Sequence, residues 1–488
     1  MIPHARRALA VAIVAGVTLG ASAVVAEAKT SPTTTPTAAP TPKRWDPRIA
    51  PIAHEVEKLR KLQFEHPVAV KFLTDKAFEK KVAVDKGKLT AADKRQAKQS
   101  QSQLRAVGLI GPDVDLLDAT SSLQKSGVLA YYENATKSIT VKGTKLDDIA
   151  TKVTLAHELT HALQDQHFDL TALERAAAKA HSSTVMRTII EGDAVRIQHD
   201  YVDTLSKADQ TAYEHESSDQ SDQARTEASD AGVPEALSVF FEAPYDLGPL
   251  MLDAVIAKQK IAGIDKLFEH PPTSDSAYLT PSTLLDGSKF ESVSAPKVRS
   301  GEKRLGQPDS FGAFALYQVL ASRIDPADAL KAADGWGGDA MVTFRRGTTT
   351  CLRSAFVGRD RGDTATIGAA LTQWAKAMPA GAAKVETGKQ VVLTACDPGA
   401  AATEAPNRAL TALILAATRD ELFLEVLKQG IDVPVAVCTS DTLVRDPVFT
   451  PILQALTENP NAAPDDETLA GLRSRVAEVF VGCRRSGS

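Results

Sequence analysis

The stretch Thr154–Leu170 reads TLAHELTHALQDQHFDL, and it decides more about this chain than any other segment. Apolar residues recur every three or four positions over residues 146–163, which predicts one face of a helix. Four residues advance a helix by roughly 400°, so His157 and His161 should project from the same face, one turn apart. Two imidazoles at this spacing can bind one zinc ion. Glu158 beside the first could take a proton from a water on the metal.

A catalytic zinc ion needs a third protein ligand, and the sequence offers two. His167 follows His161 by six residues, but Gln164 stands where a glycine would let the chain leave the helix. Glu191 lies on a second predicted helix, over residues 183–205, and apolar neighbours indicate that it is partly buried. A carboxylate from an adjacent antiparallel helix would complete a site of two histidines and one glutamate. We therefore favour Glu191 and keep His167 as the alternative ligand.

Three more polar residues could support this site. Asp165 follows His161 by four residues and could hold a ligand imidazole through its second nitrogen. His199 and Tyr201, on the helix of Glu191, could stabilise the oxyanion of a tetrahedral intermediate. A surface or packing role remains open for all three.

The pattern of elements predicts an α+β fold. A strand over 67–73 and a hairpin over 127–141 precede the histidine-bearing helix, and a strand–helix–strand pattern extends to Cys396. The final 85 residues look like a small helical unit. The expected divisions are a domain over 45–290, an α+β region over 291–400 and a helical unit over 401–488. A chain of 488 residues suits roughly three domains.

The first residues point to export. Residues 1–28 combine a basic start, an apolar run and small residues before Ala28, which predicts a signal peptide or, if uncleaved, an N-terminal anchor. Residues 29–44 form a Thr/Pro-rich linker. We expect a secreted protein that stays at the cell surface, and touches a membrane, only if that first segment is uncleaved. The net charge of −5 argues against a nucleic-acid partner.

All four cysteines lie in the last 138 residues. In an oxidising compartment an even number suggests disulfides, and four cysteines allow three pairings. Cys351 and Cys396 belong to neighbouring predicted strands, and Cys438 and Cys483 flank the terminal helices. We predict the pairs Cys351–Cys396 and Cys438–Cys483, with free thiols or zinc thiolates as the alternative.

From about Ile52 to Trp374 the sequence resembles secreted or lipid-anchored bacterial neutral zinc metallopeptidases of gluzincin type. The segments that carry the resemblance are the hairpin Tyr131–Val141, HELTHALQDQHFDL (157–170), EGDA (191–194), Pro271-Pro272-Thr273-Ser274 and Gly335-Trp336-Gly337-Gly338-Asp339. Similar proteins carry a His-Pro where this chain has Thr280-Pro281. By its residues alone, Gly335–Asp339 reads as a tight turn before a strand.

The resemblance implies a zincin-like domain over 45–290 that binds one Zn²⁺ through His157, His161 and Glu191. It implies a zinc metallopeptidase that hydrolyses peptide bonds in peptide or protein substrates with Glu158 as general base. The competing hypothesis is a catalytically silent extracellular scaffold of the same fold that serves cell-envelope interactions. The linker and the long C-terminal half, which shows no chemistry of its own, favour that alternative.

Overall fold

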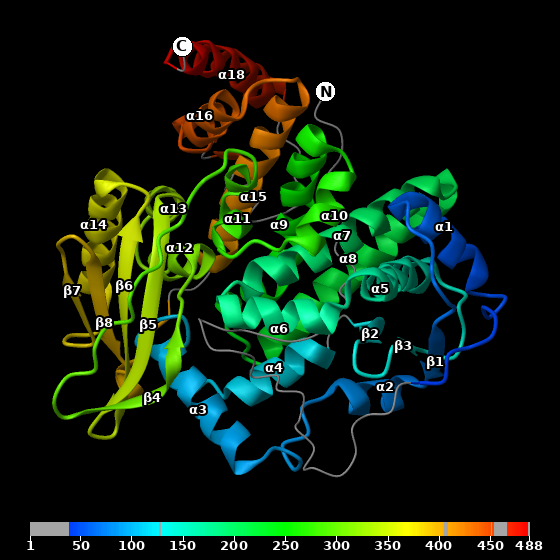
Figure 1. Ribbon diagram of the computed structural model, residues 1–488, viewed down its shortest axis with the longest axis horizontal. Coiled ribbons are helices and arrows are strands. Elements are labelled where there is room, and N and C mark those ends of the chain that lie inside the picture. The colour runs from blue at the N-terminus through cyan, green and yellow to red at the C-terminus, as the bar shows by residue number, and fades with distance from the viewer. Residues whose placement is uncertain (1–38, 126–127, 405–407, 450, 453–465, 487–488) are drawn as a thin grey trace.

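The computed structural model describes residues 39–125, 128–404, 408–449, 451–452 and 466–486. The predicted signal segment and most of the linker lie outside these residues. The described chain is a mixed α+β fold with a sheet at each end and helices between them (Figure 1). The α+β prediction is confirmed, whereas the proposed domain boundaries stay a prediction.

The smaller sheet has the strand order β1-β3-β2, with β1 parallel to β3 and β2 antiparallel to it. The larger sheet has the order β4-β5-β6-β8-β7 and is antiparallel throughout. The strands are β1 (Ala69–Leu73), β2 (Ala130–Glu133), β3 (Ser138–Lys142), β4 (Glu302–Asp309), β5 (Trp336–Arg346), β6 (Thr349–Gly358), β7 (Ala383–Glu386) and β8 (Val391–Cys396).

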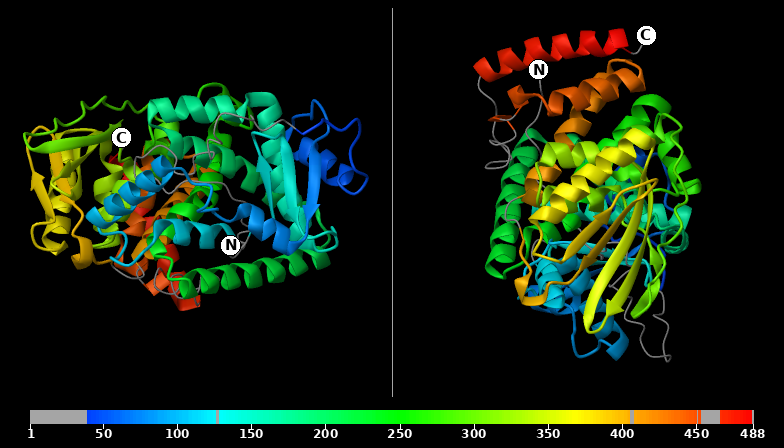
Figure 2. Two further views of the ribbon diagram at one scale, coloured as in Figure 1. Left: turned by 90° about the horizontal axis from the view of Figure 1, so that it is seen from below. Right: turned by 90° about the vertical axis from the view of Figure 1, so that its left-hand side faces the viewer.

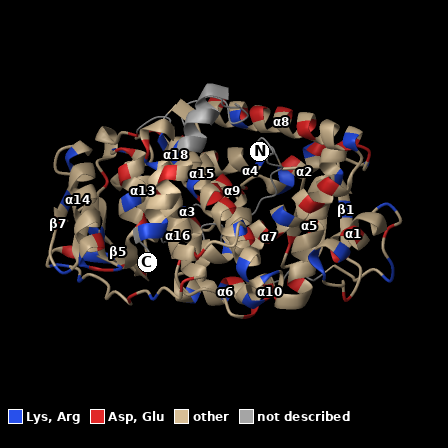
Figure 3. Cartoon of the chain, turned by 90° about the horizontal axis from the view of Figure 1, so that it is seen from above, with Lys and Arg blue, Asp and Glu red and all other residues tan. Residues whose placement is uncertain are grey.

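Helices make up most of the remaining fold. They are α1 (Ala50–Arg60), α2 (Asp75–Val82), α3 (Ala91–Ala106), α4 (Leu116–Lys125), α5 (Ile149–Phe168), α6 (Leu170–Ala180), α7 (Ser183–Thr204), α8 (Lys207–Asp230), α9 (Glu235–Gln259), α10 (Ala262–Glu269), α11 (Ser276–Leu279), α12 (Ala313–Ala321), α13 (Pro326–Asp334), α14 (Arg361–Ala377), α15 (Arg408–Lys428), α16 (Val433–Val444) and α18 (Asp466–Ser486). The acids of α8 follow one edge of the molecule (Figure 3).

Two hydrophobic cores position the metal centre. The larger core joins α4, α9, α12 and α14 to the inner face of the five-stranded sheet, and includes Ile189 and Ile190 of α7. The second core joins α1, the three-stranded sheet and α5, and includes Ile197 and Val202 of α7. Helix α7 therefore passes from one core to the other along its length.

The five-stranded sheet packs one face on α14 and α3, and Figure 2 shows α14 lying across it. Trp336 and Asp339 belong to β5, so the turn predicted for Gly335–Asp339 is wrong. The reason is that Asp339 ties the start of this strand to the N-terminus of α12, which precedes it in the chain. Its carboxylate accepts hydrogen bonds from the backbone amides of Phe311 and Gly312 at 2.6 and 2.9 Å.

Both predicted disulfides are present. Cys351 and Cys396 face each other on β6 and β8, and Cys438 joins α16 to Cys483 on α18. Each bond closes a loop of 45 residues, which restricts the unfolded chain. Within the part of the chain that is described, no helix is both long enough and apolar enough to cross a bilayer.

Candidate metal centre

Helix α5 is fixed at both ends, and this sets where its histidines point. At its start the Asp148 side chain accepts a hydrogen bond from Thr151 N at 2.6 Å, and Glu216 of α8 accepts one from Ala150 N at 3.0 Å. These carboxylates accept hydrogen bonds from amides that have no partner inside the helix. Their negative charge also stabilises the positive end of the helix dipole. Asp169, with a φ of 48°, ends the helix. The helix predicted from the apolar spacing is therefore confirmed.

His157, His161 and Glu191 come together in one buried group, as the sequence predicted. The Nε2 atoms of the two histidines are 3.0 Å apart. Glu191 Oε2 lies 3.4 Å from His157 Nε2 and 3.3 Å from His161 Nε2. These separations match a tetrahedral zinc site, in which bonds of about 2.0–2.1 Å place ligand atoms roughly 3.3 Å apart. Among the described residues, this is the group of histidine, cysteine and acidic side chains that could hold a metal ion.

Two glutamines orient the imidazoles. His157 Nδ1 lies 3.1 Å from Gln198 Oε1, and the Gln198 amide nitrogen donates to the Tyr213 hydroxyl at 2.9 Å. His161 Nδ1 lies 3.0 Å from Gln164 Oε1. Because an amide oxygen only accepts, each Nδ1 carries the proton and each Nε2 presents its lone pair to the centre.

A third layer holds Gln164 itself. Its amide nitrogen donates to Asp193 Oδ2 at 3.0 Å, and the same oxygen accepts from Arg60 Nε at 2.7 Å. Arg60 is fully buried and also donates to Asp265 at 2.7 Å. The N-terminal helix α1 thereby supports the orientation of His161 through two intervening side chains.

The donor set fits a cation. Two imidazole lone pairs and one carboxylate oxygen converge, and Glu191 Oε2 has no hydrogen-bond partner among the described residues. Burial raises the pKa of Glu191, but the two histidines lower it by more, so the net shift is downward. Burial lowers the pKa of His161, whereas Glu191 raises it by more, to about 9. The carboxylate of Glu191 therefore favours a positive charge at this cluster, which a proton on His161 or a metal ion held by the Nε2 lone pairs would supply.

Glu158 lies beside the ligands and is 1% exposed. Its Oε2 accepts a hydrogen bond of 2.6 Å from the backbone amide of Tyr132, on the edge strand β2. Its Oε1 is buried and finds no partner among the residues that the structure describes. Burial raises the pKa of this carboxyl, although His157 and His161 oppose the shift. A carboxylate with a free oxygen and a raised pKa is suited to accepting a proton.

Asp165 does not hold an imidazole, so that prediction is wrong. Its Oδ2 accepts hydrogen bonds from the Tyr132 hydroxyl at 2.5 Å and from Lys137 Nζ at 2.6 Å, and its Oδ1 accepts from Leu170 N at 3.1 Å. The physical reason is that Gln164, one residue earlier, already occupies His161 Nδ1. Asp165 instead fastens the β2–β3 hairpin to α5.

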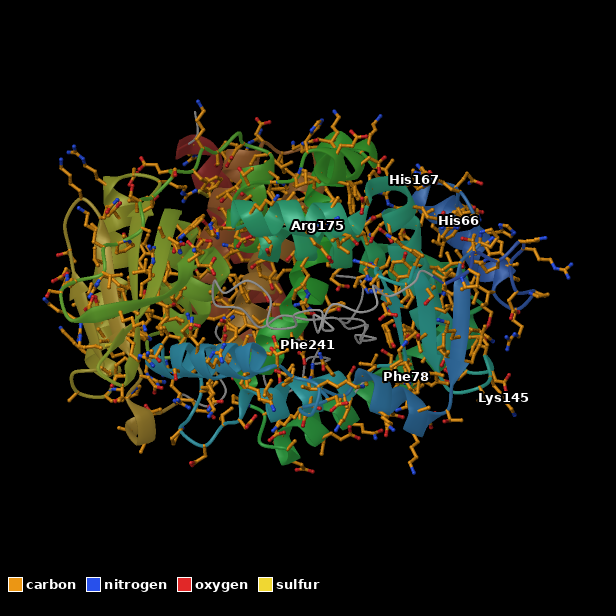
Figure 4. The ribbon with its side chains drawn as sticks, turned by 60° about the horizontal axis from the view of Figure 1, so that its bottom comes forward. His66, Phe78, Lys145, His167, Arg175 and Phe241 are labelled. Atoms are coloured by element: carbon orange, nitrogen blue, oxygen red, sulfur yellow. A yellow bond between two sulfur atoms is a disulfide. The ribbon has the colours of Figure 1, made fainter. Side chains whose placement is uncertain are left out.

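His167 lies away from the metal group. Its Nε2 is 2.8 Å from the carbonyl oxygen of Gln63, and its side chain lies on the outer side of the molecule near His66 (Figure 4). Helix α5 continues to Phe168, so His167 stays on a different face from His157 and His161. His167 is therefore not part of the group that could hold a metal ion.

The two residues predicted to stabilise an oxyanion lie further along α7. His199 is eight residues beyond Glu191, an axial rise of about 12 Å, and its role stays a prediction. Tyr201 packs in the second core, and its electrostatic neighbours are Glu55 and Asp209. The role of Tyr201 also stays a prediction, and ten residues of helix, an axial rise of about 15 Å, separate it from Glu191.

Helix α7 is held by a close crossing with α9. Asp275 accepts a hydrogen bond of 2.9 Å from Val185 N and so caps the start of α7. At the crossing, a Cβ placed on Gly192 would lie 2.5 Å from the backbone carbon of Gly248. Only glycine at both positions permits the backbones to approach this closely. Gly192 therefore sets the distance between the backbone next to Glu191 and helix α9.

Sequence reasoning missed the residues that approach the ligands from α9 and from the start of α7. The Tyr245 ring lies 6.1 Å from the His157 ring, measured between centroids. Arg187 precedes Glu191 by one helical turn, and its Nη2 donates to the Phe241 carbonyl at 3.4 Å. The only sequence signal was the i, i+4 spacing of Arg187 and Glu191.

Comparison of the chain with protein-family models, with curated proteins and with solved structures finds no match. The assignment of this centre therefore rests on its geometry: a buried pair of histidines and a glutamate of zincin type, with a second glutamate beside them.

Proposed function

We propose that this protein is a zinc-dependent peptidase that hydrolyses peptide bonds at the centre formed by His157, His161 and Glu191. The observation that carries the proposal is the convergence of their three ligand atoms beside the unpartnered Oε1 of Glu158. Two imidazoles and one carboxylate that leave a position open are the ligand set of catalytic zinc. Zinc bound there would polarise a carbonyl group and lower the pKa of water towards 7.

The residues of the chain then have separate tasks. Glu158 Oε1 accepts a proton from the attacking water and returns it to the leaving amine. The Tyr132 amide holds the other oxygen of Glu158, so the carboxylate cannot rotate away. Gln198 and Gln164 keep the ligand nitrogens pointed at the centre. The edge strand β2 brings backbone groups to the same place, where an extended peptide could pair with them.

The test compares the parent protein with Glu158→Gln, which keeps the shape and the Tyr132 contact but removes the base. We expect both proteins to bind one zinc ion per chain, measured by metal analysis after dialysis. We expect the parent to cleave casein or a mixed peptide library, and the variant to lose activity by at least about 100-fold. Glu214→Gln, at an exposed glutamate of α8, is the matched control and should retain parent activity.

Zinc bound by a parent protein that cleaves nothing across a broad peptide library would favour the silent scaffold instead. Equal turnover by Glu158→Gln and the parent would remove Glu158 from the mechanism. We also propose that the protein works outside the cytoplasm, since two disulfides persist best in an oxidising compartment.

A further inference from the structure

Arg187 is a cation beside the proposed metal centre that lacks an acidic partner. It lies four residues before Glu191 on α7, so both side chains emerge from the same face of the helix. Its electrostatic neighbours are Tyr245, whose side chain also hydrogen-bonds to it, Glu191 and Tyr278. Its guanidinium carbon lies 5.9 Å from the centre of the Phe241 ring.

The hydrogen bonding of Arg187 is incomplete. Its Nη2 reaches a carbonyl oxygen at the long distance of 3.4 Å, and its Nε is buried with no partner in the described chain. Glu191, the nearest acid by sequence, faces the two histidines instead. Across the described residues no ion pair joins Arg187 to a carboxylate, whereas the fully buried Arg60 and Arg353 each have one.

A guanidinium that is partly withdrawn from water and has no carboxylate within ion-pair distance is costly, and the cost falls when an anion binds to it directly. Arg187 is only partly buried as a residue, so a ligand can reach it. A guanidinium presents several N–H donors in a planar fork, and a carboxylate is the group that fits this fork with two parallel hydrogen bonds. The Tyr245 ring lies 6.1 Å from the His157 ring between centroids and is also a neighbour of Arg187, so Arg187 lies near the metal ligands.

We propose that Arg187 binds a carboxylate of the substrate beside the metal centre and so makes the enzyme selective for peptides with a negative charge next to the scissile bond. This inference rests on the proposed peptidase function. The carboxylate could be the C-terminus of the substrate, which would make the enzyme a carboxypeptidase or peptidyl-dipeptidase. It could equally be the side chain of an aspartate or glutamate in a longer peptide.

The test measures binding and needs no turnover. Two pairs of peptide hydroxamates, which ligate zinc through the hydroxamate, are titrated into the zinc-loaded protein by calorimetry. The first pair ends in a free carboxylate or a carboxamide, and the second carries glutamate or glutamine in a chain with a blocked end. We expect the parent to bind the charged member of one pair about 10- to 100-fold more tightly. The pair that shows the preference identifies the source of the carboxylate.

The variant Arg187→Gln should bind both members of that pair equally, with the affinity of the parent for the neutral one. Arg187→Lys keeps the charge without the fork and should retain part of the preference. Arg175→Gln is the matched control on α6, where Arg175 is exposed and bonds its own helix (Figure 4). Its preference should equal that of the parent.

Equal binding of charged and neutral hydroxamates by the parent in both pairs would overturn the inference and leave the peptidase proposal standing. A preference that survives in Arg187→Gln would assign the carboxylate to another residue and also overturn it. Failure of every hydroxamate to bind, or of zinc to bind, would refute the proposed function and this inference together.

Discussion

Replacing Gly192 with alanine tests whether the α7–α9 crossing positions the metal ligand Glu191. The new Cβ would lie 2.5 Å from the backbone carbon of Gly248 and 2.7 Å from its oxygen, whereas ordinary contacts begin near 3.4 Å. No side chain can rotate to relieve this overlap, because the opposing atoms are main chain. The two helices must therefore separate by roughly 1 Å at the residue next to the ligand.

The magnitude follows from two opposing effects. Overpacking a tight contact costs about 1–3 kcal/mol, and alanine recovers up to about 1 kcal/mol over glycine in a helix. The free energy of unfolding should therefore fall by up to about 3 kcal/mol. Because Glu191 moves with the backbone of Gly192, we expect zinc affinity to fall by about 10- to 100-fold, the range found when the support of a ligand is lost.

Zinc affinity is measured by competition with a chromogenic chelator, and stability by urea denaturation of the metal-free protein. The matched control is Gly482→Ala on α18, where an added Cβ would meet nothing within 4 Å. That change should leave zinc affinity unchanged and should not reduce stability. If Gly192→Ala bound zinc as tightly as the parent and unfolded at the same urea concentration, the reasoning about the crossing would be refuted.

Two further perturbations test other parts of the structure. Gln164→Leu removes the acceptor that holds His161 Nδ1, so chelator competition should show zinc affinity lower by about 10- to 100-fold; unchanged affinity would refute the orienting role. The hydrogen bonds from Arg353 lower the pKa of Glu302 from 4.5 to about 2, so the pair stabilises the fold above pH 4.5 and loses this contribution as the pH falls towards 2. Glu302→Gln should therefore be less stable than the parent in urea at pH 7, and the difference should shrink towards pH 2; a difference independent of pH would contradict this.

Local spacing along the sequence was enough to predict the two histidine ligands of the candidate site. His157 and His161 share a face because four residues make about one helical turn, and this does not depend on the rest of the fold. Glu191 could be favoured because it lies on the next apolar helix. The disulfides followed from the order of the predicted strands and helices, with Cys351 and Cys396 in register on neighbouring strands.

The supporting residues could not be predicted, because their partners are chosen by how helices cross. Gln198 meets His157 across 41 residues of sequence, and Arg60 meets Asp193 across 133. Asp165 had the right spacing to reach an imidazole, but the neighbouring Gln164 took that position. Local periodicity gives the face of a helix, whereas only packing decides which side chain on that face reaches a given atom.

Helix α7 leaves the larger core after Ile190 and enters the second core by Ile197, and Glu191 lies at the passage between them. The apolar residues that flank the histidines on α5 belong to the second core: Leu155, Ala156, Leu159 and Ala162. A bound ion would therefore connect the two halves of the interior, and its affinity would count towards folding as well as towards chemistry. Zinc at a thousand times its dissociation constant would add about 4 kcal/mol to the free energy of unfolding. Metal supply would then govern how much of the protein accumulates, and not only how fast each copy turns over.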